Sequence, residues 1–488
     1  MTGLSRRFQP VETYREAEQQ GYSLLPIRFT PLDEGRIVVT NMVGELIVLN
    51  REELVGLVDG TLTPSTSLYD DLKSRHFIYD QDSNSALDLL GLKYRTKLHR
   101  LAQFTALHIF VVSLRCDYSC QYCQVSRQTE DRAAFDMSPE TADAALAMVF
   151  SNPATSLKIE FQGGEPLLNF ELIRYIVAKA KLLNTPNPRH LQFVITTNLS
   201  YLTDEVMQFC RVEGVYLSTS LDGPSWLHNK NRPRPGKNGH ELTVRAIRRV
   251  QSELGRDHVS ALMTTTLESL EHVEAIIDEY VALDLHSVFL RPLSPYGFAI
   301  KTGHINKYDT ERWINFYKQG LDYILKLNRS GYRLTEQYTT IILRKMLTAQ
   351  DPGYVDLQSP AGAGLSAIVY NYDGDVYASD EARMLAEMGD KTFRMGNVHT
   401  DKYEDIYLND TWLDALEQSM TVSAPTCTDC AFLPYCGSDP VYHYATQRDW
   451  VGNKAISAFC AKNMSIFQHL TTLLEDDPQA RKTLLGWL

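Results

Sequence analysis

The chain has 488 residues, of which 44% are hydrophobic, and its formal net charge is -12. This length and composition predict a globular protein with two or three domains, and the negative charge argues against a protein that follows nucleic-acid phosphates with a basic face. No apolar run reaches membrane-spanning length and the first residues lack a signal core, so we expect a cytoplasmic protein without membrane contacts. In that compartment the eight cysteines stay reduced.

Residues 1–100 predict a small winged-helix-like module with a linker. Residues 36–40 and 45–49 are β-rich runs joined through Asn41 and Gly44, and the pattern predicts helices over residues 51–58 and 66–75. Residues 81–104 are polar and mixed in charge, which predicts a linker into the next domain.

Strands and helices alternate from residue 107 onward. Strands are expected over residues 107–112, 157–161, 191–196, 215–221, 259–264 and 287–290, and helices over residues 139–150, 170–183, 204–212, 241–254 and 270–283. Six such steps predict an α/β fold over residues 101–345, in which a parallel sheet bends into a partial (β/α)6 barrel with its functional loops at the carboxyl ends of the strands.

Three cysteines follow the first of these strands. Cys116, Cys120 and Cys123 have the spacing Cys-x3-Cys-x2-Cys, and Tyr122 precedes the last of them. Three thiolates can hold three irons of a four-iron cluster and leave the fourth iron without a protein ligand. Zinc or buried free thiols are the alternatives, although zinc ligands usually come as two cysteine pairs or with histidines at metal spacing. The pattern favours an iron-sulfur site with one open iron.

Polar motifs also end the next three predicted strands. The paired glycines in the first motif would let the backbone approach a ligand closely, although a tight turn is the alternative interpretation. The motifs contain Gln162, Gly163, Gly164 and Glu165, then Asn198, and then Ser220 with Asp222. Asp222 can equally serve its own turn.

For two further features of this region we expect a structural role and no part in function. Arg232, Arg234 and Lys237 form a basic patch in a Pro/Gly-rich loop, where we expect solvated side chains. Cys210 lies in a helical pattern and is expected to be a core residue.

The C-terminal part predicts helices over residues 308–347, a hairpin over residues 367–377 that turns at residues 372–375, and a second set of cysteines. Cys427, Cys430, Cys436 and Cys460 supply four thiolates, which form a closed set. By spacing alone, zinc and a four-iron cluster both fit this set.

Cys-x3-Cys-x-Tyr-Cys followed by Gly163-Gly164-Glu165-Pro166 after the next strand resembles the radical S-adenosylmethionine (SAM) enzymes. In that family SAM chelates the open iron, and an electron from the cluster cleaves SAM to a 5'-deoxyadenosyl radical. The resemblance implies a catalytic [4Fe-4S] cluster on Cys116, Cys120 and Cys123. The SAM-binding residues that it implies are Tyr122, Gln162, Gly163, Gly164, Glu165, Asn198 and Ser220.

Residues 346–488 resemble the SPASM (or twitch-like) extension of peptide-modifying radical SAM enzymes, which usually houses two auxiliary clusters. Gly362, Gly364, Ser379 and Pro440 stand where the first auxiliary cluster would take its ligands. The resemblance therefore implies only the second auxiliary [4Fe-4S] cluster, on Cys427, Cys430, Cys436 and Cys460. In some related maturases an aspartate after the lost cysteine accepts a substrate proton, so Asp380 is an acid/base candidate. A solvated loop carboxylate is the alternative interpretation of Asp380.

The stretches 290–297 and 370–380 resemble the His-Xaa-Ser system radical SAM maturases. The N-terminal order also resembles leader-peptide recognition domains, which bind a leader as an extra strand; a plain packing module is the alternative. The resemblance implies an enzyme that abstracts hydrogen from a ribosomally made precursor peptide and forms an intrapeptide cross-link. An external electron donor and a second radical SAM maturase are the further partners that it implies.

Two other functions stay open at this point. The chain could be a maturase that oxidises a cysteine or serine to formylglycine, as sulfatase maturases do, although loss of the first auxiliary cluster weighs against this. It could also be a non-catalytic iron-sulfur or zinc protein that escorts a leader peptide.

Overall fold

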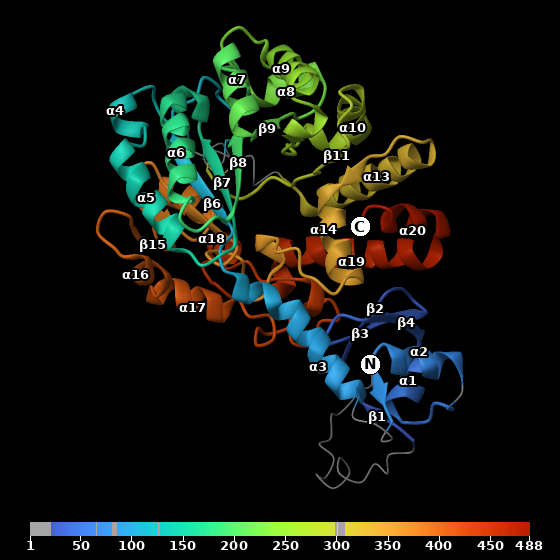
Figure 1. The fold of residues 1–488 in the computed structure, drawn as a ribbon. Helices are drawn as coiled ribbons and strands as arrows, with labels where there is room; N and C mark the ends of the chain where they lie inside the picture. The colour runs from blue at the N-terminus through green and yellow to red at the C-terminus, as the bar shows by residue number, and fades with distance from the viewer. Residues whose placement is uncertain are drawn as a thin grey trace. The chain divides into compact units, whose positions relative to one another are not determined.

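A computed structural model describes residues 21–64, 66–80, 85–120, 122–123, 127–297, 300 and 308–488. The chain forms two compact units, which are Met1–Lys97 with Asp429–Pro434, and Leu98–Thr428 with Tyr435–Leu488 (Figure 1). Among the helices described, none combines the length and the apolar character that crossing a membrane requires.

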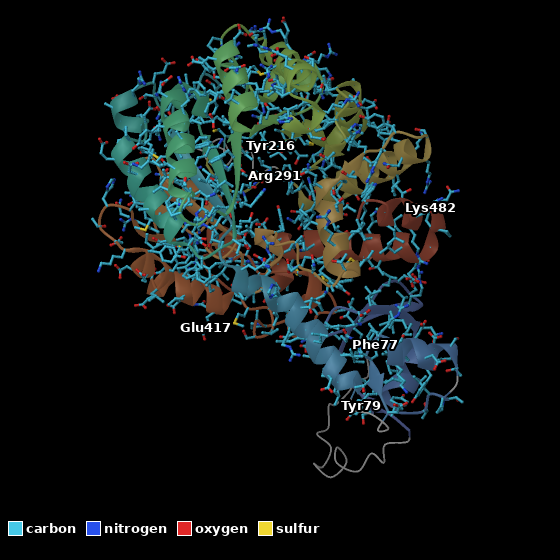
Figure 2. All side chains as sticks on the ribbon, viewed as in Figure 1. Phe77, Tyr79, Tyr216, Arg291, Glu417 and Lys482 are labelled. Atoms are coloured by element: carbon cyan, nitrogen blue, oxygen red, sulfur yellow. The ribbon has the colours of Figure 1, made fainter. Side chains whose placement is uncertain are left out.

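The smaller unit is built on a three-stranded antiparallel sheet of β2 (Ile27–Pro31), β3 (Arg36–Asn41) and β4 (Leu46–Asn50). Helices α1 (Arg51–Val58) and α2 (Ser67–Ser74) pack on it around the fully buried Phe77 (Figure 2). Asn50 and Glu53 form a capping box that begins α1 directly after β4. The short strands β1 (Ser23–Leu24) and β5 (Ile78–Tyr79) pair beside this sheet. The predicted hairpin and both predicted helices are confirmed.

The segment predicted as a linker is wrong in its main part. Residues 85–98 form helix α3 (Ser85–Leu98), and a 3-10 turn (His99–Gln103) follows it, while residues 81–84 lie outside the described residues. The leucines of this segment recur at helical spacing among its charged residues. Leu90 is buried against Leu25 and Val43, and this apolar contact stabilises a helix in a polar sequence.

The larger unit contains an eight-stranded sheet in the order β10-β9-β8-β7-β6-β13-β14-β15. Its strands from β6 to β10 are parallel neighbours in chain order, and β13 extends the sheet in parallel on the other side of β6. The parallel strands are β6 (Leu107–Ser113), β7 (Ser156–Gly163), β8 (His190–Thr196), β9 (Val215–Ser220), β10 (Val259–Leu262) and β13 (Ala367–Tyr370). The antiparallel strands are β14 (Asp375–Tyr377) and β15 (Arg394–Asn397).

Helices connect the parallel strands, as the sequence predicts (Figure 1). The connecting helices are α4 (Arg132–Phe135), α5 (Pro139–Ser151), α6 (Phe170–Leu183), α7 (Asp204–Glu213), α8 (Ser225–Asn231), α9 (Gly239–Glu253) and α10 (Val273–Ala282). Ser138 caps α5 and Pro139 occupies its first turn. Phe110, Val111 and Val112 are fully buried, as expected for a parallel strand covered on both faces. The mixed α/β fold with its parallel, barrel-type sheet is confirmed.

The sixth predicted barrel strand differs from expectation. Only β11 (Ser287–Val288) forms there, and it pairs in parallel with β12 (Thr335–Glu336) instead of joining the main sheet. The amide of Leu290 donates to the buried carboxylate of Glu336 at 3.2 Å, so a side chain replaces the next strand hydrogen bond. Pro292 follows soon after and has no amide hydrogen to continue a ladder.

Helices dominate the rest of the larger unit. They are α13 (Thr310–Arg329), α14 (Gln337–Leu347), α15 (Asp380–Glu387), α16 (Tyr403–Tyr407), α17 (Asp410–Gln418), α18 (Pro440–Gln447), α19 (Ala458–Asp476) and α20 (Pro478–Leu485). The predicted helical region and the hairpin of β13 and β14 are confirmed. The sequence did not indicate that β13 would extend the barrel sheet beside β6.

Candidate functional site

The predicted SAM-site motifs meet at one edge of the parallel sheet. Cys116 follows β6, Gly164 follows β7, Asn198 follows β8, and Ser220 is the last residue of β9. Because these strands are parallel neighbours, their carboxyl ends lie together. Gln121 and residues 124–126 of the cysteine loop lie outside the described residues.

The entry to the cysteine loop is fixed by Arg115. Its Nε and one terminal nitrogen each donate to the Asp136 carboxylate at 2.7 Å, and the same terminal nitrogen donates to the Leu168 carbonyl at 2.8 Å. Ser113 Oγ also donates to Asp136 at 2.7 Å. A bidentate pair between a buried arginine and a carboxylate has a defined geometry. It therefore holds the backbone from which Cys116 departs.

The two glycines let the end of β7 press directly against this loop. The amides of Gly164 and Glu165 donate to the carbonyls of Ser113 and Arg115 at 2.8 and 2.7 Å. A Cβ atom on Gly163 would lie 1.9 Å from the Ser113 oxygen, and one on Gly164 would lie 2.3 Å from the Arg115 oxygen. Gly163 also has a φ of +145°, which disfavours other residues. Both positions therefore require glycine.

Glu165 links this turn to the end of β8. Its wholly buried carboxylate accepts hydrogen bonds from Thr197 Oγ1 at 2.6 Å, from the Asn198 amide at 2.8 Å and from the Leu167 amide at 3.0 Å. Burial raises the pKa of Glu165 to about 7, although these hydrogen bonds act in the opposite direction. Glu165 therefore stabilises the turn after β7 and the end of β8, and both of its carboxylate oxygens accept hydrogen bonds from the protein.

Asn198 and Gln162 border the cysteine loop and the barrel interior. Asn198 Nδ2 donates to Asp117 Oδ1 at 2.9 Å and lies 4.0 Å from Cys116 Sγ. Gln162 Nε2 donates to Glu160 Oε1 at 2.9 Å. Ser220 is half-buried at the end of β9, and no described residue forms a hydrogen bond with its hydroxyl. The Ser220 hydroxyl is therefore available to a ligand.

Tyr122 is locked by a buried ion pair. Its hydroxyl donates to Asp222, and Arg232 Nε donates to the same carboxylate oxygen at 3.1 Å. The Arg232 guanidinium lies 5.3 Å from the centre of the Tyr122 ring. Nearby, Arg234 pairs with Asp117 at 3.4 Å, and the Ser119 amide donates to the Pro233 carbonyl at 2.8 Å. The loop expected to be solvated therefore packs on the cysteine loop, and for Arg232 and Arg234 that expectation is wrong.

Asp117 and Arg232 are the residues of this site to which the sequence assigned no role, whereas Asp222 was noted at a strand end with its own turn as the alternative. The position of Asp222 directly after a strand was a usable signal. The sequence contains no such signal for Arg232, because a basic residue in a Pro/Gly-rich loop is usually exposed.

The thiols of Cys116, Cys120 and Cys123 are half-buried neighbours. Burial raises the pKa of Cys120 to about 12, which Arg232 opposes and Cys123 reinforces. Burial also raises the pKa of Cys116, with contributions from Glu165 and Cys120. In the described ranges, no three His, Cys, Asp or Glu side chains converge on a single-ion position. A four-iron cluster takes one thiolate per iron, so three adjacent thiols beside a cation fit it.

The second set of cysteines is divided between the two units. In the larger unit Cys427, Cys436 and Cys460 all act electrostatically on Lys454, whose pKa burial lowers and these thiols raise. Lys454 Nζ donates to Ser438 Oγ at 2.7 Å. In the smaller unit Cys430 lies in the segment Asp429–Pro434, where Thr40 Oγ1 donates to the Ala431 carbonyl at 2.6 Å. Burial raises the pKa of the Cys430 thiol.

Asp380 begins α15, directly after the capping residue Ser379. Its carboxylate pairs with Arg383, whose Nε and one terminal nitrogen both lie 3.1 Å from Asp380 Oδ1. Arg383 is almost fully buried. The solvated-loop alternative for Asp380 is therefore wrong, and Asp380 would have to leave this ion pair to take up a proton.

The positions related to the first auxiliary cluster are tightly packed. A Cβ atom on Gly362 would lie 2.2 Å from Gln358 Oε1, and one on Gly364 would lie 2.3 Å from Trp412 Nε1. Ser379 is buried, and its hydroxyl accepts a hydrogen bond from the Ala382 amide at 3.2 Å. Gln358 and Trp412 therefore occupy the space that a cysteine side chain would need at Gly362 or Gly364.

The prediction that Cys210 is a core residue is confirmed, because Cys210 is fully buried.

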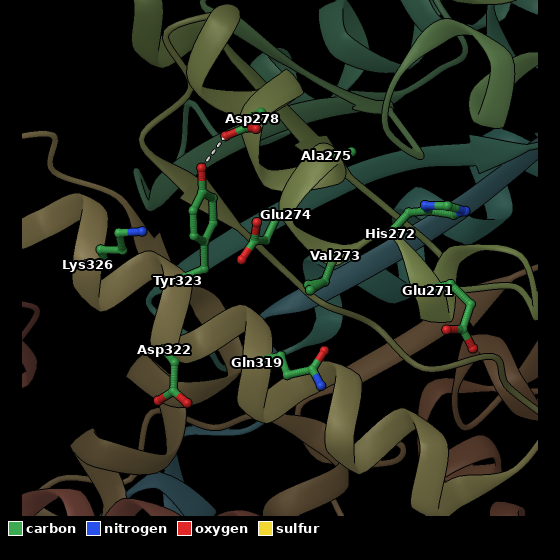
Figure 3. Close-up of a pocket in the computed structure, with 10 residues that line it drawn as sticks. All are labelled: Glu271, His272, Val273, Glu274, Ala275, Asp278, Gln319, Asp322, Tyr323 and Lys326. Carbon is green, nitrogen blue, oxygen red and sulfur yellow. Dashed lines mark hydrogen bonds between the residues drawn. The ribbon is translucent and has the colours of Figure 1, made fainter.

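A cavity of about 710 Å³ lies between α10 and α13 (Figure 3). Acidic side chains surround it, and Tyr323 OH donates to Asp278 Oδ1 at 2.7 Å across it. None of the predicted site residues lines this cavity, so its size does not mark the site predicted from the motifs.

Sequence comparison connects this geometry to known proteins. The model of the radical SAM superfamily matches residues 110–280. An uncharacterised protein of Methanocaldococcus jannaschii is 27% identical over 188 residues, which are 38% of this chain and 62% of that protein. An uncharacterised protein of Methanothermobacter thermautotrophicus is 30% identical over 209 residues, covering 40% of this chain and 73% of that protein. A cysteine-type anaerobic sulfatase-maturating enzyme of Clostridium novyi is 20% identical over 370 residues, covering 74% of this chain and 95% of that protein.

Solved structures share the fold. Native anSMEcpe with bound AdoMet superposes with a TM-score of 0.62 at 16% identity, covering 78% of this chain and 99% of that chain. Streptococcus suis SuiB bound to the precursor peptide SuiA gives a TM-score of 0.52 at 15% identity, covering 88% of this chain and 98% of that chain. The match of the radical SAM superfamily model over residues 110–280, together with the cysteine loop and the Gly-Gly turn that supports it, identifies the chain as a member of the radical SAM superfamily.

Proposed function

We propose that this chain is a radical SAM maturase that abstracts hydrogen from a ribosomally made precursor peptide and forms a cross-link within it. The observation that carries the radical chemistry is the cysteine loop itself, locked by Gly163 and Gly164 behind it and by Asp222 and Arg232 beside it. Such rigid support holds reacting groups in a fixed geometry.

Superfamily membership implies a [4Fe-4S] cluster and SAM. When bound, they supply a 5'-deoxyadenosyl radical that abstracts hydrogen. Cys116, Cys120 and Cys123 would hold the cluster, and the Arg232 guanidinium offsets negative charge beside Cys120.

SAM would lie at the strand ends, where its polar groups need partners. Asn198, Gln162 and the free hydroxyl of Ser220 face this region, and Tyr122 offers a ring held in place by Asp222. Gly163 and Gly164 would offer backbone groups to SAM, and Glu165 keeps their turn in position. Closure of the site by substrate would exclude water, which protects a radical from side reactions.

We further propose that Cys427, Cys430, Cys436 and Cys460 hold one auxiliary [4Fe-4S] cluster. The spacing in the sequence supports this set, and the shared effect of three of these thiols on Lys454 agrees with it. Asp380 is the proposed acid/base residue, acting once its pair with Arg383 opens.

The precursor would be held by the smaller unit. Strand β2 is an edge of its sheet, and within the described residues no strand pairs with its outer side. Phe29 on β2 is 53% exposed, which suits an added strand with an apolar side chain. The likeness to SuiB bound to SuiA supports a peptide substrate. An external electron donor and a second maturase of the His-Xaa-Ser type are the other proposed partners.

A formylglycine-forming activity is the second candidate. The similarity to cysteine-type and serine-type anaerobic sulfatase-maturating enzymes favours it, the latter from Bacteroides thetaiotaomicron at 20% identity over 382 residues. The packing at Gly362 and Gly364, where the first auxiliary cluster would take ligands, weighs against it.

Product analysis separates these candidates. The anaerobically reconstituted chain is incubated with SAM, a reductant and a precursor peptide encoded beside its gene. We expect 5'-deoxyadenosine and a peptide that has lost two hydrogens and resists fragmentation between the linked residues. An aldehyde product with ordinary fragmentation would support formylglycine formation. Without any 5'-deoxyadenosine, the non-catalytic escort function would replace both.

A further inference from the structure

A second cavity, of about 60 Å³, lies inside the larger unit and contains none of the residues assigned above. It is lined by the segment after β11, by residues 354–356, by the N-terminal ends of α15 and α18, and by α14 and α19. Figure 2 labels Arg291, which lies on the first of these segments. Aromatic side chains form much of its wall, namely Phe289, Tyr296, Tyr338, Tyr354, Tyr442 and Phe459.

Charged groups of both signs also line this cavity. Asp356, Glu381 and Asp439 supply three carboxylates, and Arg291 and Lys462 supply two cations. The Arg291 guanidinium lies 3.6 Å from Glu381 Oε1. Three carboxylates against two cations leave one negative charge in excess when all are ionised. Above about pH 8, where the carboxylates of Glu381 and Asp439 are ionised, the cavity is one positive charge short of neutrality.

The two cations of the lining, Arg291 and Lys462, already contact other side chains of the wall. Lys462 Nζ lies 5.3 Å from the centre of the Tyr338 ring and 5.1 Å from that of Phe459. This contact shows that the aromatic wall accommodates a cation. Asp439 Oδ1 accepts the amides of Val441 and Tyr442 at 3.0 Å each, as the cap of α18, which leaves its second oxygen for the cavity.

A polar atom in the wall also lacks a partner. Tyr296 is 1% exposed, and among the described residues none forms a hydrogen bond with its hydroxyl. A buried hydroxyl without a partner costs free energy, so it marks a place where another polar group is accommodated. As an acceptor, this hydroxyl suits an N-H donor.

We propose that this cavity binds the positively charged end of a substrate side chain, an ammonium or a guanidinium group. The proposal rests on the proposed function, because it assigns the cavity to the peptide substrate. Aromatic faces with an excess carboxylate are the surroundings that organic cations prefer. The volume corresponds to a few water molecules, so it accepts the tip of a side chain and excludes a whole metabolite. A bare metal ion is disfavoured, since no three carboxylates described here converge on one ion position.

The affinity should depend on pH. Burial and Asp356 raise the pKa of Glu381 to about 7 and that of Asp439 to about 8. A bound cation stabilises the ionised carboxylates and expels their protons, so binding strengthens as pH rises through this range. The titratable and charged groups that interact with these two carboxylates are Asp356, Asp380, Arg291, Lys454, Lys462, Tyr296, Tyr354 and Tyr442.

The test uses the full chain and two small probes, N-acetyl-lysine methylamide and its uncharged counterpart N-acetyl-norleucine methylamide. Calorimetric titration at pH 6 and pH 8.5 should show the lysine probe binding about tenfold more tightly than the norleucine probe at pH 8.5, and more weakly at pH 6. Glu381→Gln should weaken the lysine probe about tenfold. Glu274→Gln, in the open acidic cavity between α10 and α13, is the matched control and should leave binding unchanged.

Equal affinity for both probes, or equal effects of the two substitutions, would overturn the assignment. The titration needs neither SAM nor a reductant, so its failure is distinct from failure of the proposed function. A chain that forms 5'-deoxyadenosine but ignores the charge of the probe would disprove only the cavity assignment. A chain that binds the lysine probe but never cleaves SAM would disprove only the radical chemistry.

Discussion

The hydroxyl of Tyr122 donates a hydrogen bond to Asp222, and the two residues lie a hundred positions apart in the chain. Arg232 pairs with the same carboxylate and covers the Tyr122 ring. One fully buried carboxylate therefore fixes the aromatic residue of the cysteine loop and the cation beside Cys120. These contacts among the chain's own side chains therefore hold Tyr122 and Arg232 in place.

Asp222→Asn should destabilise the chain and weaken SAM binding. The change leaves the buried Arg232 guanidinium without its countercharge, which costs about 3–5 kcal/mol for a buried pair. Urea unfolding measures the loss, and titration with SAM measures the affinity. Asp204→Asn is the control, since its partner Arg249 lies at an exposed ion pair. Equal stability of the two variants would contradict the role given to Asp222.

Gly164→Ala should shift the Gly-Gly turn away from the cysteine loop. Its Cβ atom would lie 2.3 Å from the Arg115 carbonyl oxygen, so the backbone must move, at a cost of about 1–3 kcal/mol. We expect a lower iron content after reconstitution and slower formation of 5'-deoxyadenosine. Gly91→Ala in α3 meets no atom within 4 Å and should be neutral or slightly stabilising. If both variants retain full iron, the close approach is not needed.

The barrel strands β6 to β10 and the connecting helices α5, α6, α7, α9 and α10 could be predicted from the sequence because their apolar periods are local. The cysteine loop and Gly163-Gly164 could also be predicted, since each motif is contiguous. Helix α3 was missed because charged residues between its leucines obscured their helical spacing, and Leu90 is the leucine of this helix that is buried. The role of Arg232 depends on a contact with a separate loop, and no local pattern reports it.

The same limit applies to the short strand β11 and to the small cavity. The pairing of β11 with β12 joins segments nearly fifty residues apart. Residues from 289 to 462 meet around the cavity, and each is unremarkable in its own stretch of sequence. Long-range packing of this kind leaves no periodicity to detect.

Glu165 should make stability depend on pH. Its pKa is raised by burial to about 7, above the ordinary value near 4.5, so the folded state binds its proton more tightly than the unfolded state. Stability from this group is therefore greatest below about pH 4.5 and falls as pH rises toward 7. The difference in unfolding free energy between the native chain and Glu165→Gln should shrink from pH 5 to pH 7.5. A difference that grows over this range would show that hydrogen bonding outweighs burial.

Cys436→Ala should remove the auxiliary cluster and leave the catalytic one. We expect the iron content to fall from about eight to about four per chain, while SAM cleavage without peptide persists. Metal analysis and electron paramagnetic resonance of the anaerobic protein provide the measurement, and Cys210→Ala is the control because Cys210 is a buried core residue. One zinc per chain in the native protein, lost on this substitution, would assign the four cysteines to zinc instead.

Asp380→Asn should reduce cross-linked peptide at least tenfold while 5'-deoxyadenosine still forms. The reason is that proton transfer follows hydrogen abstraction, and general bases contribute about two to four orders of magnitude. Arg383→Lys, which keeps the positive charge beside Asp380, is a control for the ion pair. Unchanged product with Asp380→Asn would limit Asp380 to its pairing with Arg383.

The central claim is that three cysteines hold a cluster whose open iron binds SAM. The most direct measurement is 5'-deoxyadenosine formed by the anaerobically reconstituted chain with SAM and dithionite, beside the triple variant Cys116→Ala, Cys120→Ala, Cys123→Ala. The account predicts turnover by the native chain and none by the variant, with the auxiliary iron retained. Equal turnover by both proteins, or zinc bound by the native trio, would contradict it.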